Sequence, residues 1–253
     1  MPSHKLHWIG TGNAFNFDRG NTSFTVSGDG KRVLLVDCGG TVPLRLLQLD
    51  KLAPVTDVLI THLHADHVGG LESLIFFNFY ALGRQFENKL RIHVATEAFA
   101  HRLWEHTLKG GMQANVDNKQ NPITCTLDYY CEVHVHSEFQ VDGLPKVRFF
   151  PTEHVANLEN YGVLVGDSVR YSGDTIEPPT NLSSVAVHFQ ETEVRHPRVP
   201  GIHLTYEALC GAISDPAERA KIFLVHTGGN AEADIVEKDG FAGIVEPGQE
   251  FDI

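Results

Sequence analysis

The chain is predicted to be an α/β protein in which two β-sheets pack face to face and helices cover their outer sides, an αββα arrangement. Short β-type runs recur along its 253 residues, and segments with an apolar spacing near 3.6 lie between groups of them. Together the strands and helices form two similar halves. Apolar residues make up 42% of the chain, and no linker or charge run divides it, so one domain over 1–253 is expected.

The expected strands show two kinds of pattern. Several alternate apolar and polar residues, as half-buried antiparallel strands do. Others, such as the VLLV run, are apolar throughout and are expected to be buried on both faces. The predicted strands span 5–10, 22–28, 32–38, 57–61, 90–95, 132–136, 146–152, 161–166, 168–173, 185–190 and 222–227.

Helices are predicted where apolar residues recur about every 3.6 positions. Thr96 is expected to be an N-cap, and Asp215-Pro216 is expected to start a further helical turn. The predicted helices span 42–52, 68–83, 96–108, 204–213 and 230–238.

One long segment fits neither pattern. Residues 110–130 (GGMQANVDNKQNPITCTLDYY) are rich in Gly, Asn and Gln and show no clear period. A loop of this length is usually a lid, an interaction loop or disordered. An irregular loop is therefore expected here.

Charge and composition limit the classes of partner. The formal net charge of −12 argues against broad binding to long nucleic acid, which needs dense Lys and Arg. The N-terminus has no apolar stretch of signal-peptide length, and the most apolar window, 74–82, is too short to span a bilayer. A cytoplasmic protein without a membrane partner is expected. The four cysteines show no CxxC spacing, which argues against a structural zinc knot.

Histidine is unusually frequent, with 15 in the chain, and three of them lie in 61-THLHADHVGG-70. Alternation along the extended part places His62 and His64 on one side, and the turn into a helix brings Asp66 and His67 to face the same cavity. Two imidazoles two residues apart can share a metal ion, while the Asp-His pair is offset from them. This geometry favours two adjacent ions over one.

The motif resembles that of the metallo-β-lactamase superfamily, and the resemblance extends along the whole chain. That superfamily also has a His near mid-chain, an Asp after a later strand and a His near the C-terminus. These are matched here by His154, Asp174 and His226. The resemblance implies that one ion is held by His62, His64 and His154, that the other is held by Asp66, His67 and His226, and that Asp174 bridges both.

Other residues compete for these roles. His134 and His136 are alternatives to His154, which is favoured because it lies just beyond a strand end. Asp174 could instead belong to a simple Gly-Asp-Thr turn. The remaining histidines are expected to be surface or core residues, among them His93, His101, His106 and His196.

The ligand types indicate the metal and the reaction class. His and Asp are borderline-hard ligands, so zinc is expected and manganese or iron are alternatives. Two divalent ions about 3.5–4 Å apart lower the pKa of a bridging water and clamp a phosphoryl oxygen. The predicted reaction is therefore a hydrolysis.

Four further segments resemble the tRNase Z branch of the superfamily. The opening 10-GTGNAFNFDRGNTSF-24 with 35-LVDCGG-40 is similar to that branch, and so are 188-HFQETEV-194 and 203-HLTYEAL-209. The resemblance implies that Glu191 orients His203, which would face the scissile phosphate and donate a proton or stabilise charge. Leu204 departs from the pattern, where a Ser is expected. A structural role for His203 at a helix start is the alternative.

The tRNA-binding arm of that branch has no counterpart here. Only the residues 155–173 separate His154 from Asp174, and they are predicted to form two strands joined by a turn. The chain thus resembles the small armless phosphodiesterases of the anti-Pycsar type, which degrade cyclic nucleotide immune signals. The resemblance implies a homodimer in which a loop, here 110–130, helps to close the partner's site.

The expected function is hydrolysis of a small cyclic nucleotide to a linear monophosphate, with Asp66 as ligand and proton acceptor and with His203 and Glu191 beside the leaving oxygen. Three alternatives stay open. They are a tRNase Z-like RNA 3′-endonuclease, a metallo-hydrolase of lactones, thioesters or sulfate esters, and a non-catalytic metal-binding protein.

Overall fold

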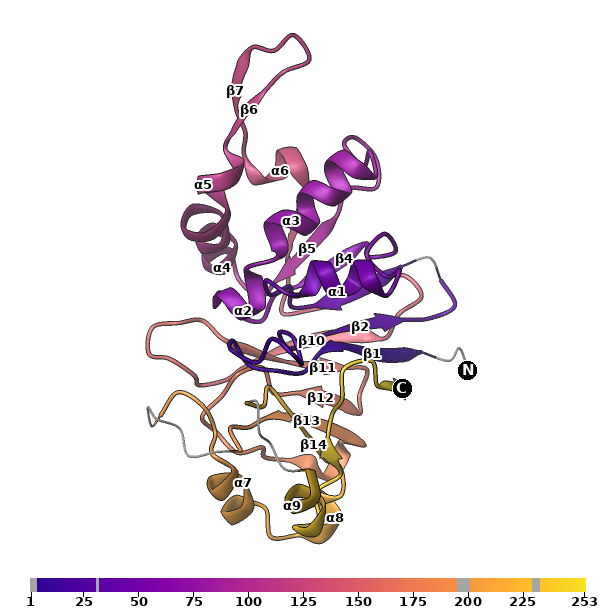
Figure 1. The fold of residues 1–253 in the computed structure, drawn as a ribbon, viewed down its shortest axis with the longest axis vertical. Helices are drawn as coiled ribbons and strands as arrows, with labels where there is room; N and C mark the ends of the chain where they lie inside the picture. Colours follow the sequence, from indigo (N-terminus) through magenta and orange to yellow (C-terminus); the bar gives the residue numbers. More distant parts are fainter. Residues whose placement is uncertain (1–3, 31, 195–200, 229–232) are drawn as a thin grey trace.

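The N-terminal half of the chain, joined by one strand from the C-terminus, builds one seven-stranded sheet, and the rest of the C-terminal half builds a second; the two sheets pack against each other between layers of helices. The computed structural model describes residues 4–30, 32–194, 201–228 and 233–253. In Figure 1, α1–α6 lie on the outer side of the first sheet and α7–α9 on the outer side of the second. This confirms the predicted αββα fold.

The first sheet is antiparallel at one edge and parallel at the other. β1 pairs antiparallel with β16 and β2, and β2 with β3, whereas β3, β4, β5 and β8 are mutually parallel. The chain therefore leaves β3 and β4 at the same edge of the sheet. The strands, in sheet order, are β16 (Glu250–Asp252), β1 (Lys5–Gly10), β2 (Ser23–Ser27), β3 (Val33–Val36), β4 (Asp57–Leu59), β5 (Arg91–Val94) and β8 (Glu132–Val135).

The second sheet repeats this division. β9 to β12 pair antiparallel, and β12 to β15 pair parallel. Its strands, in sheet order, are β15 (Gly243–Ile244), β14 (Ile222–Val225), β13 (Val187–Glu191), β12 (Val169–Tyr171), β11 (Tyr161–Val165), β10 (Lys146–Pro151) and β9 (Glu138–Gln140). The sequence patterns did not predict the short strands β9, β15 and β16.

Three apolar clusters fill the spaces between the four layers. The central one lies between the sheets and contains Trp8, whose ring centroid is 4.8 Å from that of Phe24 and 4.9 Å from that of Phe189. A second cluster joins the first sheet to its helices, and the third packs α7 and α9 onto the second sheet. Burial of these side chains supplies most of the driving force for this packing.

The predicted helices 42–52 and 204–213 are shorter in the structure, whereas 96–108 is helical almost throughout and continues to Met112. Thr96 caps α4 by accepting a hydrogen bond from the amide of Phe99 (3.0 Å), and Asp215 caps α8, as predicted. The start of the predicted helix 230–238 falls partly outside the described residues. The helices are α1 (Val42–Gln48), α2 (Ala65–Val68), α3 (Leu71–Phe76), α4 (Glu97–Arg102), α5 (Lys109–Met112), α6 (Leu127–Tyr130), α7 (Tyr206–Ala212), α8 (Pro216–Arg219) and α9 (Ala233–Lys238), with π-helical turns over Phe77–Ala81 and Leu103–Leu108 and a 3₁₀ turn over Leu182–Ser184.

The prediction that one helix spans 68–83 is wrong about where the helical structure begins. The helical turn of α2 already begins at Ala65 and α3 starts separately after Gly70. The turn after β3 packs closely on α2, and this requires glycine at position 39. A Cβ at Gly39 would lie 1.9 Å from the carbonyl oxygen of Asp66. Asp66 and His67 are thus positioned by a short helix that packs on the turn after β3.

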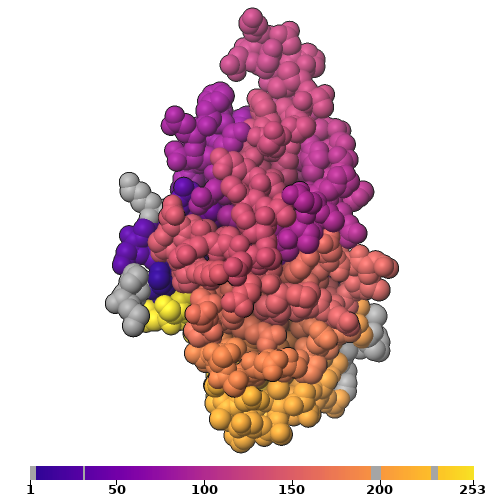
Figure 2. All heavy atoms as spheres, turned by 180° about the vertical axis from the view of Figure 1, so that it is seen from behind, coloured from indigo at the N-terminus to yellow at the C-terminus, as the bar shows by residue number. Residues whose placement is uncertain are grey.

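The prediction of an irregular loop over 110–130 is also wrong. The segment finishes α5, forms the antiparallel hairpin of β6 (Ala114–Val116) and β7 (Pro122–Thr124), and ends in α6. Asp117 closes the turn by accepting hydrogen bonds from the amides of Lys119 and Asn121. The hairpin projects from one end of the molecule, far from α2 in Figure 1, and stands out as a protrusion in Figure 2. Among the described residues, no helix has the length and apolar character to cross a bilayer.

Candidate metal centre

The histidines and carboxylates named from the sequence gather where strands of both sheets end. The segment 61–67 follows β4, His154 follows β10 and Asp174 follows β12. The second half adds Glu191, the last residue of β13, and His226, which follows β14. Carboxyl ends of adjacent parallel strands meet at one edge, so residues distant in sequence come together there.

One cluster contains the first two histidines of the motif. The possible ligand atoms of His62, His64, His154 and Asp174 all lie within 4.8 Å of one another. His154 Nε2 is 3.2 Å from His64 Nδ1, and both His62 Nε2 and His154 Nε2 are 3.7 Å from Asp174 Oδ2. The alternation expected along the motif thus places two imidazoles on one side, and His154 joins them from the second sheet.

A second cluster shares Asp174 with the first. It contains Asp66, His67 and His226, again with all possible ligand atoms within 4.8 Å. His67 Nε2 lies 3.3 Å from Asp174 Oδ1, and His226 Nε2 lies 3.2 Å from Asp66 Oδ2 and 3.5 Å from Asp174 Oδ2. The motif is therefore divided two and two between adjacent groups of donors.

The buried donors of these clusters fit divalent cations. His62 Nε2, His67 Nε2 and both carboxylate oxygens of Asp174 are buried without a hydrogen-bond partner among the described residues. Orphaned buried polar atoms are costly unless something binds them. Ligand atoms about 2.1 Å from one tetrahedral zinc ion stand about 3.4 Å apart, close to the separations found here.

Burial and nearby carboxylates shift the pKa values of the clustered histidines in opposite directions. Burial lowers the pKa of His62 well below its usual value and that of His154 to about 4, so both imidazoles are neutral and have a lone pair for a metal. Burial would also lower the pKa of His67, but Asp174, Asp37 and Asp66 outweigh it and raise this pKa well above normal. A position that attracts a proton so strongly also attracts a metal cation, and the two compete.

Asp37 is a site residue that the sequence reasoning missed. Its fully buried carboxylate accepts hydrogen bonds from His67 Nδ1 (2.8 Å) and from the amide of Thr61 (2.8 Å). The bond fixes the proton on Nδ1 and directs Nε2 of His67 into the cluster. The available signal was an Asp placed directly after the buried VLLV strand.

Replacing Asp37 with Asn is expected to weaken metal binding by about 10–100-fold, the usual effect of losing a carboxylate behind a ligating histidine. The amide would still fit the cavity but would hold the His67 imidazole less firmly. Competition with a coloured chelator would measure the affinity. Asp142→Asn, at an exposed turn, is the control. Equal affinities for the two variants would contradict the role assigned to Asp37.

Glu191 and His203 form a pair at the edge of the clusters. His203 Nδ1 contacts Glu191 Oε1 and lies 4.0 Å from Asp174 Oδ2. Burial raises the pKa of Glu191 and His203 opposes this. Burial lowers the pKa of His203, but the hydrogen bond to Glu191 outweighs it and raises that pKa to about 9. The His203 imidazole therefore holds a proton at neutral pH, next to the metal clusters.

The competing histidines lie elsewhere. His134 is on β8 and its ring stacks near those of His93 and His136, with centroids 5.4 and 5.7 Å away. None of these three belongs to a group of possible metal ligands in the described parts of the chain. His101 and His106 lie on the α4 side of the first sheet, and His196 lies outside the described residues.

Two exposed aromatic side chains lie on a loop that is fastened beside the centre. Phe15 and Phe17 are 85% and 70% exposed on the loop that follows β1. The loop is nevertheless fastened: the Asn16 amide donates to the carbonyl of Thr227 (3.1 Å), next to His226. A cavity of about 550 Å³ extends from His154.

The comparisons with known proteins agree with this geometry. Residues 4–251 match the family described as anti-Pycsar protein Apyc1. The chain belongs to this family. It is 31% identical over 239 residues to the anti-Pycsar protein Apyc1 of Bacillus phage 010DV004, covering 90% of each chain. It is 29% identical over 257 residues to that of Paenibacillus harenae, covering 98% of this chain and 99% of the relative.

A solved structure supports the fold independently. The metallo-β-lactamase fold protein YhfI from Bacillus subtilis superposes with a TM-score of 0.70 at 17% identity, covering 99% of this chain and all of that one (100%). The family resemblance and the fold expected from the sequence are thereby confirmed. Family membership and the two donor clusters also assign the chain to the metal-dependent hydrolases, the predicted enzyme class.

Proposed function

We propose that the chain is a dinuclear phosphodiesterase that hydrolyses small 3′,5′-cyclic nucleotides to linear nucleoside monophosphates, and so removes signals of cyclic-nucleotide-based antiphage defence. One observation carries the proposal most strongly: the two donor clusters share Asp174, and the Glu191–His203 pair stands beside them. The anti-Pycsar family to which the chain belongs supports this class of substrate.

The two clusters would hold the metal ions, one by His62, His64 and His154 and the other by Asp66, His67 and His226, with Asp174 between them. Zinc fits these His and Asp donors, and manganese is the alternative. When bound, two such ions would lower the pKa of water and neutralise charge on the phosphodiester.

The chain's own groups handle the protons. Asp66 would accept the proton of the attacking water, which adds to phosphorus in line with the departing oxygen. His203, protonated and held by Glu191, would donate a proton to that oxygen as the ring P–O bond breaks. One water is consumed, and one linear monophosphate is released.

The alternatives predict different substrates. The residues between His154 and Asp174 include the short β11–β12 hairpin, which argues against an arm that grips tRNA. A metal-loaded preparation should therefore hydrolyse 3′,5′-cyclic purine and pyrimidine mononucleotides but not precursor tRNA, lactones, thioesters or aryl sulfates. Cleavage of one of those substrates, with the cyclic nucleotides left intact, would favour the corresponding alternative.

The exposed rings of Phe15 and Phe17, on the loop fastened to Thr227, would provide a surface for the nucleobase. Replacing both Phe15 and Phe17 with Ser is expected to raise the KM for cyclic nucleotides about tenfold, because base–aromatic stacking is worth about 1–3 kcal/mol per base. The rise should be similar for purines and pyrimidines, since every base has a stacking face. Leu47→Ser, at another exposed apolar side chain (55%), is the control. An unchanged KM in the double variant would show that the rings of Phe15 and Phe17 do not bind substrate.

We also propose that the chain forms a homodimer through its β6–β7 hairpin. All side chains of both strands are exposed or half-exposed, and an isolated two-stranded hairpin is marginally stable in water. Contact with a second copy of the chain would stabilise the hairpin, which would then lie near the metal centre of that copy. Light scattering should give a dimer for the full chain and a monomer when residues 114–124 are replaced by a short Gly-Ser linker.

A further inference from the structure

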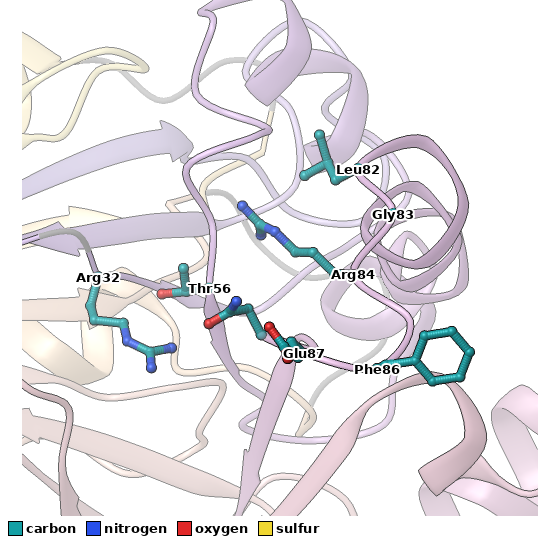
Figure 3. Close-up of a pocket in the computed structure, with 8 residues that line it drawn as sticks. Arg32, Thr56, Leu82, Gly83, Arg84, Phe86 and Glu87 are labelled. Carbon is teal, nitrogen blue, oxygen red and sulfur yellow. The ribbon is translucent and has the colours of Figure 1, made fainter.

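A polar cavity lies at the opposite end of β4 from the metal centre. It has a volume of about 850 Å³ and is situated at the amino end of β4, whereas the carboxyl end of β4 leads to His62. Figure 3 shows Arg32 and Arg84 entering it from opposite sides, with Thr56 between them and the ring of Phe86 turned away at the edge. The cavity is thus lined by two arginines and is separate from the metal clusters.

The guanidinium group of Arg84 is held in place by neutral acceptors alone. It donates to the carbonyl oxygens of Val55 and Ala53, each at 3.0 Å, and to the side-chain oxygen of Asn78. No carboxylate within the described ranges makes an ion pair with it. Burial and the nearby charge of Arg32 lower the pKa of Arg84. Its positive charge is fixed in position and uncompensated.

Arg32 has a single, distant carboxylate partner among the described residues. Its Nη1 lies 3.9 Å from Asp57 Oδ2. Asp57, which is fully buried, is already paired with Arg91 (Nε–Oδ1 2.7 Å and Nη2–Oδ2 2.9 Å) and with His93 (2.8 Å). Little of its negative charge is left for Arg32, whose side chain is 30% exposed toward the cavity.

Two guanidinium groups without a close carboxylate partner face one cavity, whose lining also includes Glu87, in a chain whose formal net charge is −12. Like charges in a partly buried site repel, and an anion between them removes that cost. The guanidinium fork matches phosphate oxygens in both geometry and charge. We infer that this cavity, lined by Arg32 and Arg84, is a second binding site, and that its ligand is a phosphate group, either free or carried by a nucleotide.

The site is tested with metal-loaded protein by calorimetric titration of inorganic phosphate and, separately, of adenosine 5′-monophosphate. Arg32→Gln is expected to weaken binding about tenfold or more, as the loss of a charged hydrogen-bond donor does. Arg148→Gln, which removes a half-exposed arginine 3.8 Å from Glu138, is the charge-matched control and should titrate like the wild type. The metal centre is the same in the wild type and in both variants, so a difference in affinity reports on the cavity.

Two further arms make the outcome decisive. Glu87→Gln, which removes the carboxylate lining the cavity and leaves both arginines, should tighten binding several-fold. Tighter binding of the nucleotide than of phosphate would identify a nucleotide as the ligand, and equal binding would identify phosphate alone. The inference fails if Arg32→Gln titrates like the wild type, or if crystals soaked with phosphate show it only at the metal centre. Hydrolysis of bis(p-nitrophenyl) phosphate should be the same in Arg32→Gln as in the wild type.

Discussion

Asp174→Ala is expected to reduce phosphodiesterase activity below detection and to weaken metal binding by more than the roughly 100-fold that loss of an outer partner causes. Asp174 is fully buried, and its two oxygens face both donor clusters. Burial would raise its pKa, but His226, His67 and His62 outweigh this and lower it far below normal, so the carboxylate is charged. Its removal takes away the negative charge that the two clusters share.

The measurement is metal content by plasma emission spectroscopy after gel filtration, together with turnover of bis(p-nitrophenyl) phosphate. Asp142→Ala, which removes a carboxylate from an exposed turn, should retain both properties. Full metal occupancy with normal turnover in Asp174→Ala would contradict the bridging role.

His203→Ala is expected to behave differently, with a loss of roughly 10²–10⁴ in kcat and unchanged metal content, the usual scale for an acid–base group. His203 faces Glu191 at the edge of the clusters. Loss of metal together with activity would show instead that His203 is a ligand. His101→Ala, an exposed histidine of α4, is the matched control and should keep full activity.

Glu191→Gln separates the proton role of His203 from a structural one. Glu191 is the group that raises the pKa of His203, and His203 donates a proton only below that pKa. Removal of the carboxylate charge lowers the pKa, so the fall of kcat on the alkaline side should shift to lower pH. A purely structural pair would lower kcat by the same factor at every pH.

Much of the candidate site could be predicted from the sequence because its signals are local. His62, His64, Asp66 and His67 lie in one short motif, whose alternation and turn already suggest two groups of donors. His154 lies just beyond one predicted strand and His226 near the end of another, where sites of α/β folds form. Their pairing across the sheets came from the family resemblance, since spacing alone does not show which distant strands are adjacent.

The features that could not be predicted depend on tertiary contacts. Nothing local indicates that Asp37 reaches His67, because the contact arises from the packing of the turn after β3 against α2. The early start at Ala65 follows from the same close approach at Gly39. The β6–β7 hairpin was missed because its strands are short and exposed, so they lack the apolar alternation on which a strand prediction depends.

Incubation of the purified, metal-loaded chain with 3′,5′-cyclic mononucleotides, followed by chromatography of the products, tests the central claim most directly. The expected result is conversion to linear monophosphates that stops with a chelator, resumes with zinc or manganese and is absent in Asp174→Ala. Cyclic nucleotides that remain intact in the presence of protein with both metal sites filled would contradict the proposed function.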